Sequence, residues 1–98
     1  MTTSPIAIFV YKRPEHTKQM LISLCQNPGY ESAEITVYCD GPRSNADDQD
    51  ISATRGMVRK LLPQANIVER DENLGLANSI ITGVSEKCQK YGRVIVIE

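Results

Sequence analysis

IAIFVYKRP, residues 6–14, indicates the fold of the whole chain. Its first six residues, Ile6 to Tyr11, are apolar at both alternating positions, which is typical of a central strand in a parallel sheet. Pro14 suits the first position of a helix, and Glu15 places an acidic charge in the favourable first turn. The segment therefore predicts a buried strand that passes almost directly into a helix.

The same alternation continues to the end of the chain. The pattern predicts a helix from Pro14 to a stop at residues 27–29, a helix from an N-cap at Asn45 or Asp47 to Pro63, and a helix after the turn at residues 70–73 that ends at Gly92. Strands are expected between these helices. They cover residues 35–39, 66–69 and 94–97. A strand-helix alternation with short connections favours an α/β fold with a mainly parallel four-stranded sheet. The buried face of the last helix is expected to hold Ala77, Ile80, Ile81, Val84 and Cys88.

Composition limits the class of protein. With 98 residues, 41% of them hydrophobic and 23% charged, the chain is expected to form one globular domain over residues 1–98. The 11 Lys and Arg against 12 Asp and Glu argue against a dedicated nucleic-acid binder. The apolar runs are too short for a transmembrane segment. No basic stretch precedes the first apolar run, so a secretory signal is not expected. The predicted compartment is therefore the cytoplasm. Because the last expected strand is buried and lacks a covering helix, we expect the chain to be the front portion of a larger domain.

Cysteine and histidine are too sparse for most metal sites. Cys25, Cys39 and Cys88 form no CxxC pair, and we expect all three to be small buried apolar residues. His16 is the only histidine, which argues against a multi-histidine metal site and against a Ser–His or Cys–His triad.

Polar residues follow each expected strand. Lys12 and Arg13 follow the first strand, Asp40 the second, residues 70–75 the third, and Glu98 the fourth. In open α/β sheets ligands bind outside the carboxyl ends of the strands. Two or three cations beside two carboxylates suit a polar ligand that carries phosphates. The GxGxxG and GxxxxGK[ST] motifs are absent, which argues against dinucleotide oxidoreductases and P-loop enzymes.

Each of these residues also has a structural interpretation. Lys12 and Arg13 fit solvated loop charges, Asp40 fits the start of a turn, and Asn73 fits an ordinary helix N-cap. Gly75 favours the functional interpretation, because glycine in a first helical turn costs up to about 1 kcal/mol against alanine and is retained where something approaches the backbone closely.

Four stretches in this order and spacing resemble a known family. They are residues 5–14, 37–41, 73–78 and 94–98, and together they make the chain similar to the nucleotide-binding front half of a GT-A glycosyltransferase of the family 2 inverting type, most of all the Golgi β-1,2-N-acetylglucosaminyltransferase group. With the alternation, the resemblance implies a three-layer α/β/α, Rossmann-like nucleotide-diphospho-sugar transferase fold, truncated at Glu98, with strand order 3-2-1-4. The first and last strands are then neighbours.

The resemblance implies a set of nucleotide-binding residues. Asp40 would accept the uracil N–H of a UDP-sugar, Arg13 would lie at the base or phosphate side, and the backbone near Tyr11 would border the base. The ribose and diphosphate would lie along the turn and helix start, and Glu98 would stand beside the metal-binding acids. The full set is Tyr11, Arg13, Asp40, Arg70, Asn73, Gly75, Asn78 and Glu98.

The same resemblance sets what the chain is expected to lack. The ligands of a Mn²⁺ or Mg²⁺ ion and the catalytic base are expected beyond residue 98, so the parent protein is expected to be a glycosyltransferase and the 98-residue piece inactive. Its expected partners are a UDP-sugar donor and an unidentified sugar or glycan acceptor. Two alternatives stay open, namely a sugar-phosphate nucleotidyltransferase and a noncatalytic nucleotide-binding or interaction domain.

Overall fold

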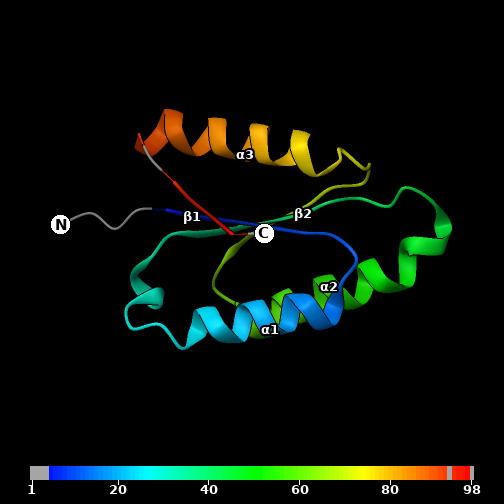
Figure 1. Cartoon of the computed structure of the whole chain (residues 1–98), viewed down its shortest axis with the longest axis horizontal. Helices are drawn as coiled ribbons and strands as arrows, with labels where there is room; N and C mark the ends of the chain where they lie inside the picture. The colour runs from blue at the N-terminus through cyan, green and yellow to red at the C-terminus, as the bar shows by residue number, and fades with distance from the viewer. Residues whose placement is uncertain (1–4, 93, 98) are drawn as a thin grey trace.

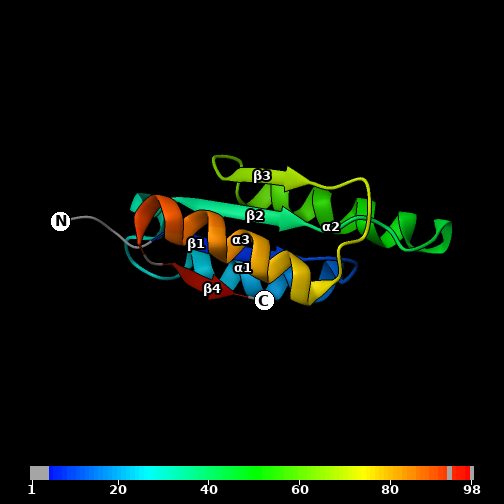
Figure 2. The same ribbon diagram turned by 90° about the horizontal axis from the view of Figure 1, so that it is seen from above.

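A four-stranded parallel sheet forms the centre of the molecule. The computed structural model describes residues 5–92 and 94–97. Its strands are β1 (Ile6–Val10), β2 (Ile35–Cys39), β3 (Asn66–Glu69) and β4 (Ile95–Ile97). They lie in the order β3-β2-β1-β4, and every pair is parallel (Figure 2). The predicted order 3-2-1-4 is confirmed, as is the pairing of the first strand with the last.

Helices cover both faces of this sheet. α1 (Pro14–Cys25) and α2 (Asp48–Leu61) lie on one face, and α3 (Leu76–Tyr91) lies on the other (Figure 1). Two 3-10 turns, η1 (Tyr30–Ser32) and η2 (Asn45–Asp47), complete the connections. The three-layer α/β arrangement expected from the alternation together with the resemblance is therefore confirmed. Among the described residues, no helix combines the length and the apolar character that crossing a membrane requires.

The larger part of the core lies between the sheet and the α1–α2 layer. β1 and β2 are buried over their whole length. Continuous apolar runs are typical of such central strands. α1 contributes Leu21 and Leu24, and α2 contributes Val58, to a single cluster of buried side chains. The opposite face has a much smaller buried cluster, formed by Ala7, Phe9 and Tyr38.

α3 packs on the sheet through different residues from those expected. Its buried residues are Ser79 and Gly83, whereas Ile81 is 63% exposed. The stacked rings of Phe9 and Tyr38 rise from the sheet with their centroids 5.1 Å apart, and a Cβ at Gly83 would lie 2.8 Å from Phe9 Cζ. The helix thus approaches the rings with its smallest side chains. The predicted buried face of α3 is wrong for three residues that are exposed, namely Ala77, Ile81 and Cys88. The other two predicted residues, Ile80 and Val84, are half-buried.

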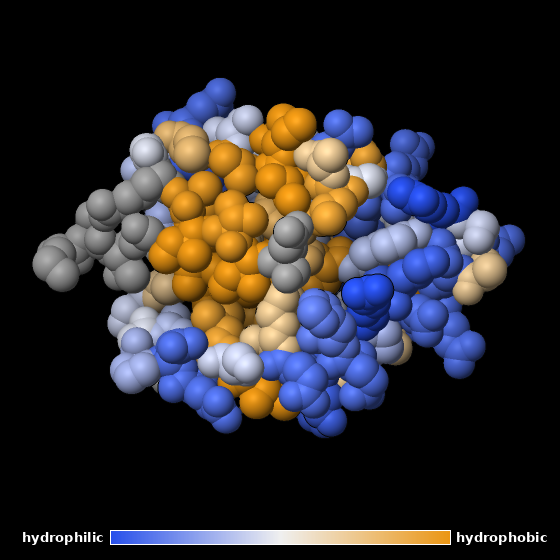
Figure 3. Space-filling view, in the orientation of Figure 1, coloured by the Kyte–Doolittle hydropathy of each residue, from blue (hydrophilic) through white to orange (hydrophobic). Residues whose placement is uncertain are grey.

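The predicted burial also differs at the cysteines and at the last strand. Cys39 is buried, Cys25 is half-buried and Cys88 is exposed, so the expectation of three buried thiols is wrong for Cys88. Ile95 and Val96 of β4 are 49% and 41% exposed, because β4 is an edge strand. Apolar residues accordingly cover the middle of the face on which β4 lies (Figure 3).

Candidate functional site

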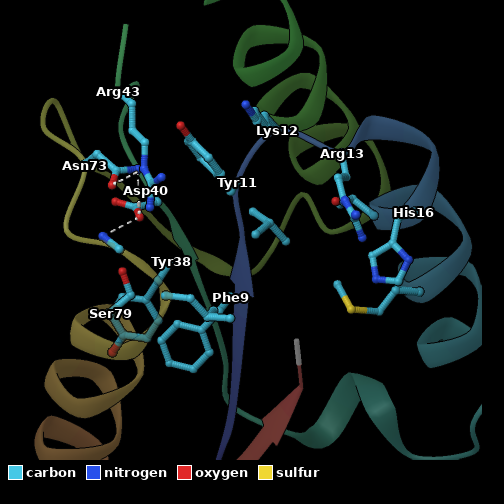
Figure 4. Close-up of a pocket in the computed structure, with 15 residues that line it drawn as sticks. Phe9, Tyr11, Lys12, Arg13, His16, Tyr38, Asp40, Arg43, Asn73 and Ser79 are labelled. Carbon is cyan, nitrogen blue, oxygen red and sulfur yellow. Dashed lines mark hydrogen bonds between the residues drawn. The ribbon is translucent and has the colours of Figure 1, made fainter. Parts of the chain in front are cut away.

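A cavity of about 430 Å³ lies at the carboxyl end of β1. Among the described residues, β4 pairs with β1 from Ile6 to Ile8, and the next two residues of β1, Phe9 and Val10, line the cavity. Both helix layers contribute to its walls (Figure 4). The lining consists of Phe9, Val10, Tyr11, Lys12, Arg13, His16, Thr17, Met20, Tyr38, Asp40, Arg43, Asn73, Gly75, Leu76 and Ser79.

The carboxylate of Asp40 is fully engaged by the fold. Oδ1 accepts the backbone N–H of Gly41 at 2.9 Å and of Leu74 at 2.8 Å. Oδ2 accepts the backbone N–H of Gly75 at 3.0 Å and the amide of Asn73 at 3.2 Å. A carboxylate offers about four lone-pair sites, and four donors use them here. Asp40 therefore ties the end of β2 to the loop before α3.

This arrangement bears on the predicted uracil contact. Asp40 is 6% exposed, and its charge lies at the N-terminus of α3, where a negative charge is stabilised by the helix dipole. A base N–H could reach the carboxylate only by replacing one of the four donors. The uracil contact stays a prediction, and the structural role is the one that the hydrogen bonds describe.

Two glycines allow the loop to close on Asp40. A Cβ at Gly41 would lie 2.5 Å from the backbone of Glu72, which no side chain could tolerate without movement of the loop. Gly75 has a φ of +81°, in a region that glycine adopts readily and other residues rarely do. The DG pair at residues 40–41 and the glycine before α3 are therefore needed by the backbone itself.

Asp47 holds the segment that follows β1. Its carboxylate accepts the Tyr11 hydroxyl at 2.7 Å, the Lys12 ammonium at 2.9 Å and the backbone N–H of Arg43 at 3.3 Å. The hydrogen bonds from Tyr11 and then Lys12 lower the pKa of Asp47 to about 2. Asp47 occupies the N-cap position of α2, yet its side chain makes no capping bond. The expected cap instead fixes the rim of the cavity.

Cationic side chains surround the mouth of the cavity. Lys12, Arg13 and Arg43 all line it and are exposed, and His16 lies beside Arg13 on α1 (Figure 4). The Nε of Arg43 donates to Asn73 Oδ1 at 3.2 Å, which holds that guanidinium over the loop tied by Asp40. Lys12 is paired with Asp47, and Asp40 keeps its charge, so three cations face two carboxylates and the rim carries a small excess of positive charge.

The floor of the cavity is apolar and partly aromatic. Phe9 and Tyr38 supply stacked rings, with Met20 on the α1 side and Leu76 on the α3 side. The Tyr38 hydroxyl donates to Glu86 at 3.0 Å, and burial, then this hydrogen bond, raises the pKa of Tyr38 to about 12. An apolar floor below a cationic rim suits an anionic ligand that carries a flat, weakly polar ring.

The structure brings together five of the eight predicted nucleotide-binding residues. These five line the cavity: Tyr11, Arg13, Asp40, Asn73 and Gly75. Arg70 lies elsewhere, with its guanidinium 5.7 Å from the Tyr38 ring centre and facing a separate hollow beside Arg55 and Arg59. Asn78 is exposed and donates to the carbonyl of Leu74 at 3.0 Å. Glu98 lies outside the described residues.

Several polar residues of the cavity were not predicted from the sequence, among them Arg43 and Ser79. Arg43 comes four residues after β2, so a wider search beyond the strand ends would have found it. Ser79 had no such signal, because it lies within a helix and reaches the cavity only through the packing of α3 on the sheet.

The described residues do not fit a Mn²⁺ or Mg²⁺ ion. Among residues 5–92 and 94–97, no group of three or more His, Cys, Asp or Glu side chains is placed to hold a metal. Asp40 accepts hydrogen bonds from the loop before α3 with both carboxylate oxygens, and Asp71 and Glu72 are exposed. The metal ligands expected beyond residue 98 stay a prediction.

Comparisons with models of protein families, with curated proteins and with solved structures gave no match. The resemblance to GT-A glycosyltransferases stays a prediction from the sequence.

Proposed function

We propose that the cavity binds the nucleoside diphosphate of a UDP-sugar, and that the chain is the donor-binding part of a glycosyltransferase. The observation that carries this proposal is the cationic rim of Lys12, Arg13 and Arg43 above the aromatic floor of Phe9 and Tyr38. It lies at the carboxyl edge of the sheet, where open α/β folds bind their ligands. A volume of about 430 Å³ is within the usual range for small-molecule sites.

Charge gives the ligand an orientation. Asp40 already compensates the N-terminus of α3, so a diphosphate there would meet a carboxylate. The guanidinium groups of Arg13 and Arg43 offer several N–H donors each and are suited to phosphate oxygens. The phosphates are therefore assigned to the rim and the base to the apolar floor.

The described residues bind and orient the donor. Transfer of the sugar to its acceptor needs a base for the acceptor hydroxyl and compensation of the leaving diphosphate. The rim cations contribute to the second requirement, and the base and metal ligands are expected beyond residue 98. The cytoplasm stays the predicted compartment, in keeping with the free thiols of Cys25, Cys39 and Cys88.

A noncatalytic nucleotide-binding domain is the second candidate. It is favoured by Asp40, because this carboxylate of the cavity is committed to the loop and is not available as a base. If the coding sequence continues past Glu98, its next residues separate the two candidates. Two aspartates there favour the transferase, and apolar residues favour the binding domain.

Calorimetric titration of the chain with UDP tests the proposal. We expect binding without added metal, and a loss of roughly tenfold or more in affinity for Arg13→Ala and for Arg43→Ala, since hydrogen bonds to charged groups contribute about 1.5–3 kcal/mol. Lys60→Ala is the control, because Lys60 is an exposed cation at the far end of α2. Absence of UDP binding, or equal affinities for all four proteins, would contradict the proposal.

A further inference from the structure

We propose that the hydroxyl of Ser79 is the hydrogen-bond partner of the nucleobase edge. This inference rests on the proposed function and deepens it, because it names the residue that recognises the base. It differs from the expectation of the sequence, in which Asp40 has that role.

The hydroxyl of Ser79 is buried without a partner. The residue is 3% exposed, it lines the cavity, and its Oγ makes no hydrogen bond among the described residues. Its backbone N–H donates to the carbonyl of Gly75 at 3.0 Å, as the first turn of α3 requires. The Oγ atom is itself covered, so a ligand in the cavity reaches it after a rotation about χ1 of Ser79. Because buried polar atoms are almost always paired in folded proteins, an unpaired hydroxyl on a residue that lines a cavity points to a ligand atom as its partner.

The surroundings of Ser79 suit a flat heterocycle. Ser79 lies with Tyr38 and Phe9 on the α3 side of β1, away from Arg13 and His16 on the α1 side (Figure 4). Aromatic side chains therefore lie beside Ser79, and Arg43 is held over the loop before α3 on the same side of β1. Phe9 and Tyr38 are almost fully buried and stack on each other, so they offer a flat ring an apolar wall rather than an open stacking face. A serine hydroxyl both donates and accepts. A base carbonyl or ring N–H satisfies it equally well.

Asp40 and Ser79 differ in the number of hydrogen bonds that a ligand would add. Binding to Asp40 exchanges an existing hydrogen bond for a new one, because its four lone-pair sites already have donors. Binding to Ser79 adds a hydrogen bond where none exists. The base edge therefore gains more from Ser79, and Asp40 supports the site by fixing the loop.

An unpaired hydroxyl gives Ser79→Ala two effects of opposite sign. In the free protein the change removes an unsatisfied buried group and introduces a better helix former, so the melting temperature stays equal or rises. In the complex it removes a hydrogen bond, so the affinity for UDP falls roughly three- to tenfold. A residue that served only the fold would lose stability instead.

Calorimetry with UDP and with inorganic pyrophosphate, together with thermal unfolding, tests the inference. Ser85→Ala is the matched control, because Ser85 lies exposed on the same helix. We expect Ser79→Ala to weaken UDP binding, to leave pyrophosphate binding unchanged and to melt no lower than the wild-type protein. Arg43→Ala is expected to weaken both ligands.

The outcomes separate this inference from the proposed function. If the wild-type protein binds UDP and Ser79→Ala binds it equally well, the role of Ser79 is wrong while the proposed function stands. If Ser79→Ala weakens pyrophosphate as much as UDP, the hydroxyl contacts phosphate and the assignment to the base is overturned. If the wild-type protein binds no UDP, the proposed function itself fails.

Discussion

The two faces of the sheet are built differently. The face under α1 and α2 buries a broad cluster of aliphatic side chains, among them Leu21, Val37 and Val58. The face under α3 buries only Ala7, Phe9 and Tyr38, and the helix meets them with Ser79 and Gly83. Large side chains fill the first interface. Small ones at the second let α3 approach the rings and bring Ser79 to the cavity. The first face therefore supplies most of the core, whereas both helix layers line the cavity.

The largest effect is expected from Leu21→Ala on the α1–α2 face. Leu21 is fully buried, and its truncation leaves a cavity that should lower the free energy of unfolding by about 3 kcal/mol. On the other face, Ile81→Ala should change it by less than about 0.5 kcal/mol, because Ile81 is 63% exposed. Urea denaturation of both variants measures this contrast, and equal losses would break the comparison between the faces.

Asp40→Asn should be the most damaging substitution at the α3 side. In this variant the amide nitrogen would replace one carboxylate oxygen and could not accept the two hydrogen bonds that this oxygen accepts in Asp40. The substitution would also remove the negative charge at the N-terminus of α3. We expect the free energy of unfolding to fall by about 2 kcal/mol in urea denaturation. A variant as stable as the wild type would leave base recognition as the better account of Asp40.

A pair of glycine substitutions sharpens the comparison at closer range. A Cβ at Gly83 would lie within 3.0 Å of atoms of both rings, so Gly83→Ala should destabilise the protein by about 1 kcal/mol. Gly56 lies in α2 with open space around its Cα, so Gly56→Ala should stabilise the protein by about 0.5–1 kcal/mol through helix propensity. Thermal unfolding should show shifts of opposite sign. A stabilising Gly83→Ala would contradict the close packing of α3.

The smallest effect is expected from the titration of Asp47. Its pKa in the folded protein is lowered from 3.8 to about 2, so its stabilisation is present above about pH 4 and is lost as the pH falls towards 2. The urea midpoint of the wild-type protein should therefore fall between about pH 6 and about pH 2.5, and the fall should be smaller in Asp47→Asn. Lys12 is partly exposed, so salt should weaken the effect. Asp71→Asn, at an exposed position, is the control; an equal response from both variants would contradict the role of Asp47.

Local patterns predicted the elements well, because each depends on a short run of neighbours. The strands at residues 35–39 and 66–69 have the expected bounds, and α1 begins at Pro14 and α3 ends before Gly92 as expected. These features follow from apolar runs, from the fixed φ of proline and from the left-handed conformation that glycine adopts after a helix.

The site was predicted less completely because it depends on contacts between distant residues. Asp40 meets the amides of residues 74 and 75, and Asp47 meets Tyr11 across 36 positions, so neither role can be inferred from neighbours in the chain. The buried face of α3 was misassigned for the same reason. The apolar stripe of α3 predicted that Ile81 is buried. In the structure Gly83 is buried instead, because the Phe9 and Tyr38 rings leave no room for a side chain at that position.

The central claim is that a nucleoside diphosphate binds at the carboxyl end of β1 between α1 and α3. Titration of the ¹⁵N-labelled protein with UDP, followed by amide chemical shifts, tests it most directly. The account predicts the largest shifts at residues 11–13, 43 and 73–79, with the amides around Arg55 and Arg59 unmoved. Shifts concentrated around Arg55, Arg59 and Arg70, or none at all, would contradict it.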